Sequence, residues 1–167
     1  MEEPLVRAVL EAEAESFQST RPIVLLDTTD PWMPADEAPP PRPYQVTEAM
    51  WLEWTGPVAP GLRSNNARAH GLGALRTPQF ITTFSAAAFD AAWHSSIGLA
   101  PLVARLWGKE PLVLSVSRPY LDPAGTEGSI LVHVLSTWSG CGGINEFKLE
   151  RKGGEWRANL RRVLVTW

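Results

Sequence analysis

The chain has 167 residues, enough for one domain with a substantial hydrophobic core. It is 44% hydrophobic and 20% charged, as is ordinary for a globular protein, and its net charge of −3 argues against nucleic acid as a partner because phosphate binding needs clustered Lys and Arg. A single cysteine excludes an intramolecular disulfide.

The first element predicted is an amphipathic helix over residues 3–18. Its apolar side carries Val6, Val9, Leu10 and Phe17 at helical spacing, and the other positions carry Glu11, Glu13 and Glu15. This acidic start differs from the basic and apolar start of a signal peptide, and no apolar run approaches the ~18 residues of a membrane span. We therefore expect a cytoplasmic protein with no membrane partner.

An apolar run predicts a strand over residues 22–28. The prolines of residues 30–44 exclude helix and central strand and predict an extended loop, which a proline-reading partner could recognise or which only connects elements. A short helix is predicted over residues 47–54. Residues 55–78 predict an irregular segment with one helical turn, because turn residues occur throughout.

A short strand is predicted over residues 79–84, followed by two helices. Ser85 is the expected N-cap of the first helix, which carries Phe89 and Trp93. Pro101 is expected to open the second helix, which Gly108 ends.

Four strands are predicted from Leu112 to the C-terminus, over residues 112–118, 129–138, 144–152 and 155–167. Gly-rich turns separate them, which favours antiparallel pairing in a four-stranded meander. Alternation places Leu112, Leu114 and Val116 on one face, and in the third strand it places Glu146, Lys148 and Glu150 on a solvated face. The run Val163-Leu164-Val165 breaks the alternation of the last strand and predicts a bulge.

Together these elements predict a single α+β domain over residues 1–167. Its curved antiparallel sheet is expected to be covered by the N-terminal and central helices, as in a roll.

Several segments resemble a group of small uncharacterised bacterial α+β proteins. The resemblance extends over about half of the chain. The pieces that match are residues 23–29 (IVLLDTT), 89–93, 114–120 (LSVSRPY), 141–143 (CGG) and 153–156 (GGEW). The resemblance implies a mixed α+β roll and brings no known activity. Members of this group tend to carry a second cysteine, whereas this chain has only Cys141.

His133 is the strongest candidate for a catalytic residue, because alternation places it beside Leu131 and Leu135 on a face expected to be buried. An imidazole there acts as a general acid or base when a carboxylate pairs with it, and Asp90 or Asp27 is the candidate partner. The alternative is a structural histidine, in the core or at a sheet edge, whose ring nitrogens have hydrogen-bond partners. Aromatic residues expected to line a pocket beside it are Trp93, Trp107 and Trp138.

Other reactive groups are less informative. Cys141 lies in a glycine-rich hairpin tip, where it is either a nucleophile or a small turn residue. The chain has no nucleophile elbow, no phosphate-binding loop and no His-x-x-x-His pair, so no cofactor or metal is expected.

Three functions remain open. The first is a non-enzymatic protein-interaction module, such as an immunity-type protein, with an exposed aromatic patch drawn from its eight Trp residues. The second is a binder of a small apolar ligand, or an enzyme, with His133 as acid or base. The third is a purely structural or oligomeric subunit, such as one of a homodimer, whose apolar sheet face pairs with a second copy of the chain.

Overall fold

The computed structural model describes residues 3–17, 21–29, 60–66, 68–73, 81–136 and 142–166. The proline-rich loop, the expected helix over residues 47–54, Trp138 and Cys141 lie outside these residues. The helices are α1 (Glu3–Phe17), α3 (Pro60–Asn65), α4 (Ala86–Trp93) and α5 (Ala100–Trp107). The strands are β1 (Ile23–Leu26), β2 (Ile81–Phe84), β3 (Leu112–Val116), β4 (Tyr120–Leu121), β5 (Glu127–Ser136), β6 (Gly142–Lys152) and β7 (Glu155–Thr166).

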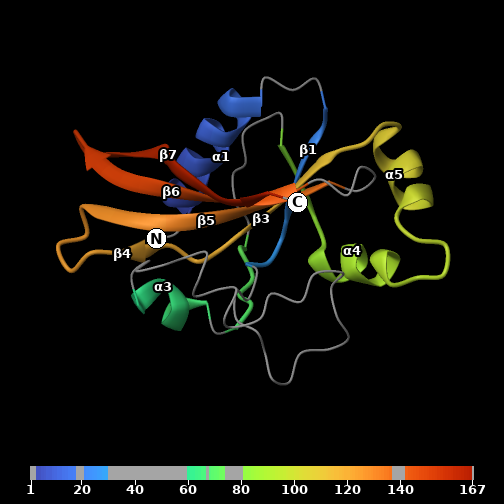
Figure 1. The fold of residues 1–167 in the computed structure, drawn as a ribbon, viewed down its shortest axis with the longest axis horizontal. Coiled ribbons are helices and arrows are strands. Elements are labelled where there is room, and N and C mark those ends of the chain that lie inside the picture. Colours follow the sequence, from blue (N-terminus) through green and yellow to red (C-terminus); the bar gives the residue numbers. More distant parts are fainter. Residues whose placement is uncertain are drawn as a thin grey trace.

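All the strands belong to one curled, mixed sheet with the order β2-β1-β3-β5-β6-β7, and β4 pairs with β5 (Figure 1). The expected α+β class and curved sheet are confirmed. A purely antiparallel four-stranded meander was too narrow a prediction, because β1 pairs in parallel with both β2 and β3. Parallel pairing of β1 with β3 is feasible because the intervening chain, which includes α4 and α5, is long enough for a crossover.

Each face of the sheet packs against its own helices. On one face, Ile23, Leu25 and Leu114 share a core with Leu5 and Val9 of α1. On the other face, Val24, Leu26 and Val113 pack against Phe89 of α4 and Val103 of α5. Successive residues of β1 thus serve opposite cores, as the two-residue period of a strand requires.

Capping residues set the bounds of the central helices. The side chain of Ser85 accepts a hydrogen bond from the backbone N–H of Ala88, as expected of an N-cap. Gly108 follows α5 with a φ of 67°, the left-handed conformation in which a helix commonly stops. Both boundaries agree with the sequence prediction.

Two irregularities bend β7 against β6. Val163 pairs with Asn145 and Val165 pairs with Ile144, so Leu164 is an extra residue and the predicted bulge is confirmed. A second register shift lies between Glu146 and Phe147 of β6. Bulges increase the local twist, which helps to curl the sheet around α1, the helix that packs closely on β7.

Helix α3 lies within the segment for which one helical turn was expected, and it is held against the chain after β3. The buried Asn66 accepts a hydrogen bond from the backbone N–H of Arg118 (2.6 Å) and donates to the carbonyl oxygens of Arg118 and Leu62. Gly61 faces the ring of Tyr120 so closely that a Cβ atom would overlap it. The absence of a side chain at residue 61 therefore allows the contact.

Candidate functional site

The sheet face opposite α1 carries a row of polar residues across three strands. On this face Ser115 of β3 is directly opposite His133 of β5, and His133 is opposite Ile144 of β6. Glu146, two residues beyond Ile144, is therefore a diagonal neighbour of His133, a separation that long side chains span. Ser115, His133 and Glu146 thus form a polar strip next to the aromatic core under α4 and α5.

Glu146 contradicts the expectation of a solvated face for its strand, because it is 0% exposed. Its Oε2 accepts a 2.6 Å hydrogen bond from Nε of Arg162 on β7, and the Arg162 side chain is 39% exposed. A buried carboxylate is costly unless a cation pairs with it. The Arg162 guanidinium supplies that cation.

His133 has a buried Nε2 atom and lies on the predicted face of β5. The two carboxylates expected to pair with it, Asp90 and Asp27, come from other elements. Asp90 belongs to α4, where its backbone carbonyl accepts hydrogen bonds from the backbone N–H and Nδ1 of His94. Asp27 accepts a hydrogen bond from the N–H of Ala86 at the start of α4. Glu146 is the acidic residue diagonal to His133 on this sheet face, and sequence reasoning did not select it.

Two of the expected pocket-lining tryptophans lie on the same side of the sheet as His133. Trp107 meets Phe84 edge to face with ring centroids 5.3 Å apart, and Trp93 lies 5.9 Å from Phe89. Both tryptophans pack against the core formed by β1, β3, α4 and α5, and Leu135 of β5 joins them there. The third candidate, Trp138, is not among the described residues.

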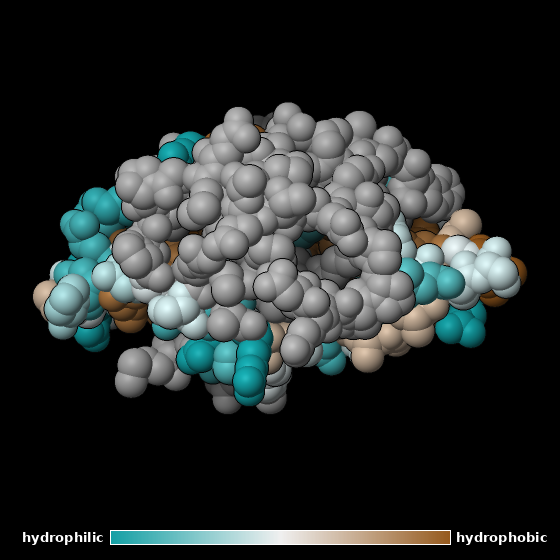
Figure 2. Space-filling view, turned by 60° about the horizontal axis from the view of Figure 1, so that its bottom comes forward, coloured by the Kyte–Doolittle hydropathy of each residue, from teal (hydrophilic) through white to brown (hydrophobic). Residues whose placement is uncertain are grey.

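The outer surface of α4, α5 and the chain between them is unusually poor in charge. We call it the α4–α5 surface. Its exposed residues are Ala87, Ala88, Ala91, His94, Ser95, Ser96, Ile97, Ala100, Pro101, Ala104, Arg105 and Leu106. On the side of the molecule where these helices lie in Figure 1, Figure 2 shows tan and brown residues with pale and teal ones among them. Ile97 is 72% exposed and Leu106 is 44% exposed.

The exposed residues of helix α1 differ in character from those of α4 and α5. Its exposed residues are Glu3, Pro4, Arg7, Glu11 and Glu15, so most of them are ionic. Arg7 and Glu11 form an ion pair one helical turn apart, with 2.9 Å between Nε and Oε1. This is the pattern of a helix with one face in water. The outer faces of α4 and α5 lack that pattern.

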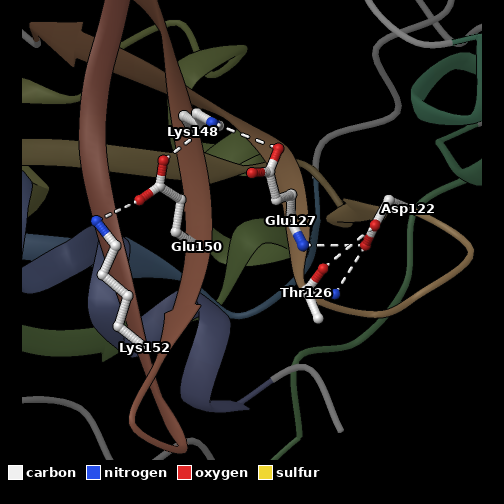
Figure 3. Close-up of polar contacts among 6 residues, drawn as sticks. All are labelled: Asp122, Thr126, Glu127, Lys148, Glu150 and Lys152. Carbon is white, nitrogen blue, oxygen red and sulfur yellow. Dashed lines mark hydrogen bonds and ion pairs between the residues drawn. The ribbon is translucent and has the colours of Figure 1, made fainter.

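The far end of β5 and β6 is, in contrast, strongly ionic (Figure 3). Lys148 lies between Glu127 (3.4 Å) and Glu150 (2.9 Å), and Lys152 lies 2.7 Å from the other oxygen of Glu150. The two lysines lower the pKa of Glu150 to about 2, chiefly through the hydrogen bond from Lys152. Glu150 in turn raises the pKa of Lys148. The charges of these side chains are paired with one another, as expected of a solvated sheet surface.

Asp122 fixes the turn that leads into β5. Its carboxylate accepts hydrogen bonds from the backbone N–H groups of Thr126 (2.8 Å) and Glu127 (2.9 Å). These bonds lower the pKa of Asp122, the one from Glu127 most strongly. The turn is therefore held by a local side chain, as Asp commonly does.

No protein-family model, curated protein sequence or solved structure matches this chain. None of the helices in the described part of the chain is both long enough and apolar enough to cross a bilayer.

Sequence reasoning missed the α4–α5 surface for a physical reason. Alanine has the highest helix propensity, so Ala87, Ala88 and Ala91 are ordinary in a helix and do not by themselves indicate an exposed apolar surface. The available signal was the scarcity of charge: from Ala86 to Trp107 the ionic residues are Asp90 and Arg105, besides His94. The interaction hypothesis expected an aromatic patch, but the described tryptophans are half-buried and the exposed apolar residues are aliphatic.

Proposed function

We propose that this chain is a protein-interaction module that docks a protein partner on the α4–α5 surface. The observation that carries the proposal is that α4 and α5 cover the sheet with apolar residues and that Arg105 is the one charged residue exposed on their outer faces. A helix that is apolar all round is ordinarily enclosed by protein. Contiguous apolar surface of this kind is typical of interaction sites.

The two exposed large side chains of this surface strengthen the proposal. Fully burying an exposed Leu or Ile side chain contributes about 1.5–3 kcal/mol. Ile97 and Leu106 are already partly buried, so docking a partner on them would contribute a fraction of that value at each. Among the described residues, Val163 of β7 is the other large hydrophobic side chain that is exposed.

Photo-crosslinking in the cells that make the protein tests the proposal. A benzophenone amino acid replaces Ala91 on the α4–α5 surface in one variant and Glu11 on α1 in another. A discrete crosslinked adduct is expected from position 91 and not from position 11, and adding Leu106→Glu is expected to remove it. Equal crosslinking from both positions, or none from position 91, would contradict the proposal.

A second function is favoured by the buried Glu146 beside His133. Buried ionisable groups next to an aromatic core are common in binding and catalytic sites. In this alternative the chain binds a small molecule on the polar strip, with His133 as acid or base and with Trp93 and Trp107 beside the ligand.

Thermal-shift screening of a small-molecule collection tests this second function. A compound that binds the strip is expected to raise the melting temperature of the wild type but not that of His133→Gln. The control is His70→Gln, which changes an exposed histidine. Equal shifts in all three proteins would exclude the polar strip as the binding site.

A further inference from the structure

We infer that the chain binds the phosphate or carboxylate group of a small molecule between the side chains of His70 and Arg118. The site lies beside the carboxyl ends of the parallel strands β1 and β3. Ligands commonly bind outside the carboxyl ends of parallel strands, at a point where neighbouring strands continue in opposite directions. The site uses no residue of the α4–α5 surface or of the polar strip, so it is independent of the proposed function.

The chain leaves β1 and β3 in opposite directions. In the sheet order β2-β1-β3-β5, the next described strand after β1 is β2, whereas the chain leaves β3 toward β5. The residues that follow the two strands are polar: residues 27–29 (DTT) follow β1, and residues 117–118 (SR) follow β3. Polar side chains from two neighbouring parallel strands are therefore gathered at this point.

The segment that carries His70 is paired with the chain that continues from β1. Thr28 forms an antiparallel bridge with Gly71. The backbone N–H of Thr29 donates to the carbonyl oxygen of His70 (2.7 Å), and the N–H of His70 donates to Oγ1 of Thr29 (2.9 Å). Thr29 is buried, whereas His70 is exposed. These contacts fix the backbone of His70 while its side chain remains accessible.

Arg118 is held beside His70 by a different set of hydrogen bonds. The buried Asn66 bonds both the N–H and the carbonyl oxygen of Arg118, which fixes the arginine backbone. Nη1 of Arg118 lies 3.5 Å from Nε2 of His70, and this contact is exposed. Groups whose positions are fixed before binding lose less entropy when a ligand arrives.

Two nitrogen atoms this close together suit one anionic oxygen, or two oxygens of one group. A guanidinium has five N–H donors in a planar fork that matches carboxylate and phosphate. Since arginine cannot accept, Nε2 of His70 is the acceptor in the present contact, and a neutral ring carries its proton on Nδ1. A proton on Nε2 instead makes it a donor, so that His70 and Arg118 donate to the same anion.

The surroundings of this pair favour negative charge. Arg68, two residues before His70, is also exposed, so three basic side chains occur in this region of a chain whose net charge is −3. Asp27 lies at the same end of the sheet, but its carboxylate accepts a hydrogen bond from the N–H of Ala86 at the start of α4. A local concentration of positive charge attracts anions from solution.

NMR titration of the isotope-labelled chain with inorganic phosphate and, separately, with acetate tests the inference at constant ionic strength. For at least one anion, the amide signals of His70, Gly71 and Arg118 are expected to shift and to saturate with a dissociation constant of about 1–10 mM. The nitrogen signal of His70 Nε2 is expected to change from that of an acceptor to that of a protonated nitrogen. The anion that binds more tightly identifies whether the ligand carries a phosphate or a carboxylate.

Variants of Arg118 separate this site from general attraction to the protein surface. Arg118→Gln is expected to weaken binding by at least about 10-fold, since it removes the charge and the charge-assisted hydrogen bonds. Arg118→Lys keeps the charge but not the planar fork, so an intermediate affinity is expected. Arg157→Gln is the matched control, because it removes an exposed arginine of β7, and it should bind the anion as the wild type does.

Shifts that rise linearly with both anions overturn the inference, and so does a loss of affinity that is equal in Arg157→Gln and Arg118→Gln. Saturable binding that leaves the Nε2 signal of His70 unchanged also overturns it. None of these results alters the photo-crosslinking expected from position 91. Failure of the anion site and failure of the proposed function are therefore observed separately.

Discussion

Glu13 of α1 and Asn145 of β6, 132 residues apart in the chain, are joined by a 2.8 Å hydrogen bond from Nδ2 of the asparagine to Oε1 of the glutamate. Glu13 was expected on the polar side of its helix, but it is 0% exposed and lies in the interface between helix and sheet. Burial raises its pKa to about 7, and the hydrogen bond from Asn145 opposes this only in part. The carboxyl group is therefore easiest to bury when it is protonated.

The first prediction concerns the pH dependence of stability. Because the pKa of Glu13 is higher in the folded chain than its ordinary 4.5, its contribution to stability is fully present below pH 4.5 and is lost as the pH rises through about 7. The variant Glu13→Gln keeps an acceptor for Asn145 and has no charge at any pH. Its free energy of unfolding is expected to exceed that of the wild type by at most about 3 kcal/mol at pH 8.

Urea denaturation at pH 5, 6, 7 and 8 measures this difference. It is expected to be small at pH 5 and to grow with pH. Glu11→Gln, at an exposed position of the same helix, is the control and should show no such trend. A difference between Glu13→Gln and the wild type that is constant with pH would contradict the raised pKa.

The second prediction concerns the ion pair between Glu146 and Arg162. Removing one partner of a fully buried pair costs about 3–5 kcal/mol, because the other charge is left buried. Since the Arg162 side chain is 39% exposed, water screens the pair and we expect Arg162→Ala to cost about 2–3 kcal/mol.

The double variant Arg162→Ala with Glu146→Gln distinguishes charge from packing. It is expected to recover part of the lost stability, because no buried carboxylate remains. Arg157→Ala changes an exposed arginine of the same strand and should leave the urea midpoint unchanged. If the double variant is less stable than Arg162→Ala alone, the buried charge is not the cause of the loss.

The third prediction concerns the contact of α3 with Tyr120. Gly61→Ala places a Cβ atom within the ring of Tyr120, and overpacking of this kind costs about 1–3 kcal/mol. Thermal denaturation measures the loss, and Tyr120→Ala in the same chain is expected to reduce the additional cost of the alanine. Gly71→Ala is the control because a Cβ atom there has open space. Equal losses from Gly61→Ala and Gly71→Ala would contradict the proposed overlap.

The fourth prediction concerns the ionic network on β6. In Lys152→Ala the pKa of Glu150 is expected to rise from about 2 toward its ordinary value, because the strongest hydrogen bond to the carboxylate is lost. NMR titration of the Glu150 carboxyl carbon measures this change. High salt is expected to raise the same pKa in the wild type, since the network is exposed. An unchanged pKa in Lys152→Ala would assign the effect to Lys148 alone.

The sequence predicted what alternation and capping determine. Leu114 and Val116 face α1 because a strand repeats every two residues, and Ser85 and Gly108 mark helix ends because their chemistry suits those positions. The place of β1 could not be predicted in the same way. Its residues are apolar on both faces, which indicates a buried strand but does not identify its neighbours.

The burial of polar residues in the interior was also not predicted from the sequence. Periodicity assigns a glutamate to the surface, so Glu13 and Glu146 were placed in water. Their burial depends on Asn145 and Arg162, which are distant in sequence or separated from them by a hairpin. Pairings of this kind arise from the curl of the whole sheet and leave no local pattern in the chain.

The central position of β1 has a consequence for synthesis of the chain. β1 leaves the ribosome before both of its neighbours, β2 and β3, which are made only after the long segment that follows it. Its apolar residues Val24 and Leu25 therefore remain unpaired with β2 and β3 until those strands have been synthesised. Pairing between strands so distant in sequence is slow, and the nascent chain is open to aggregation in the interval. We expect chaperones that bind short apolar segments to recognise β1 during this time.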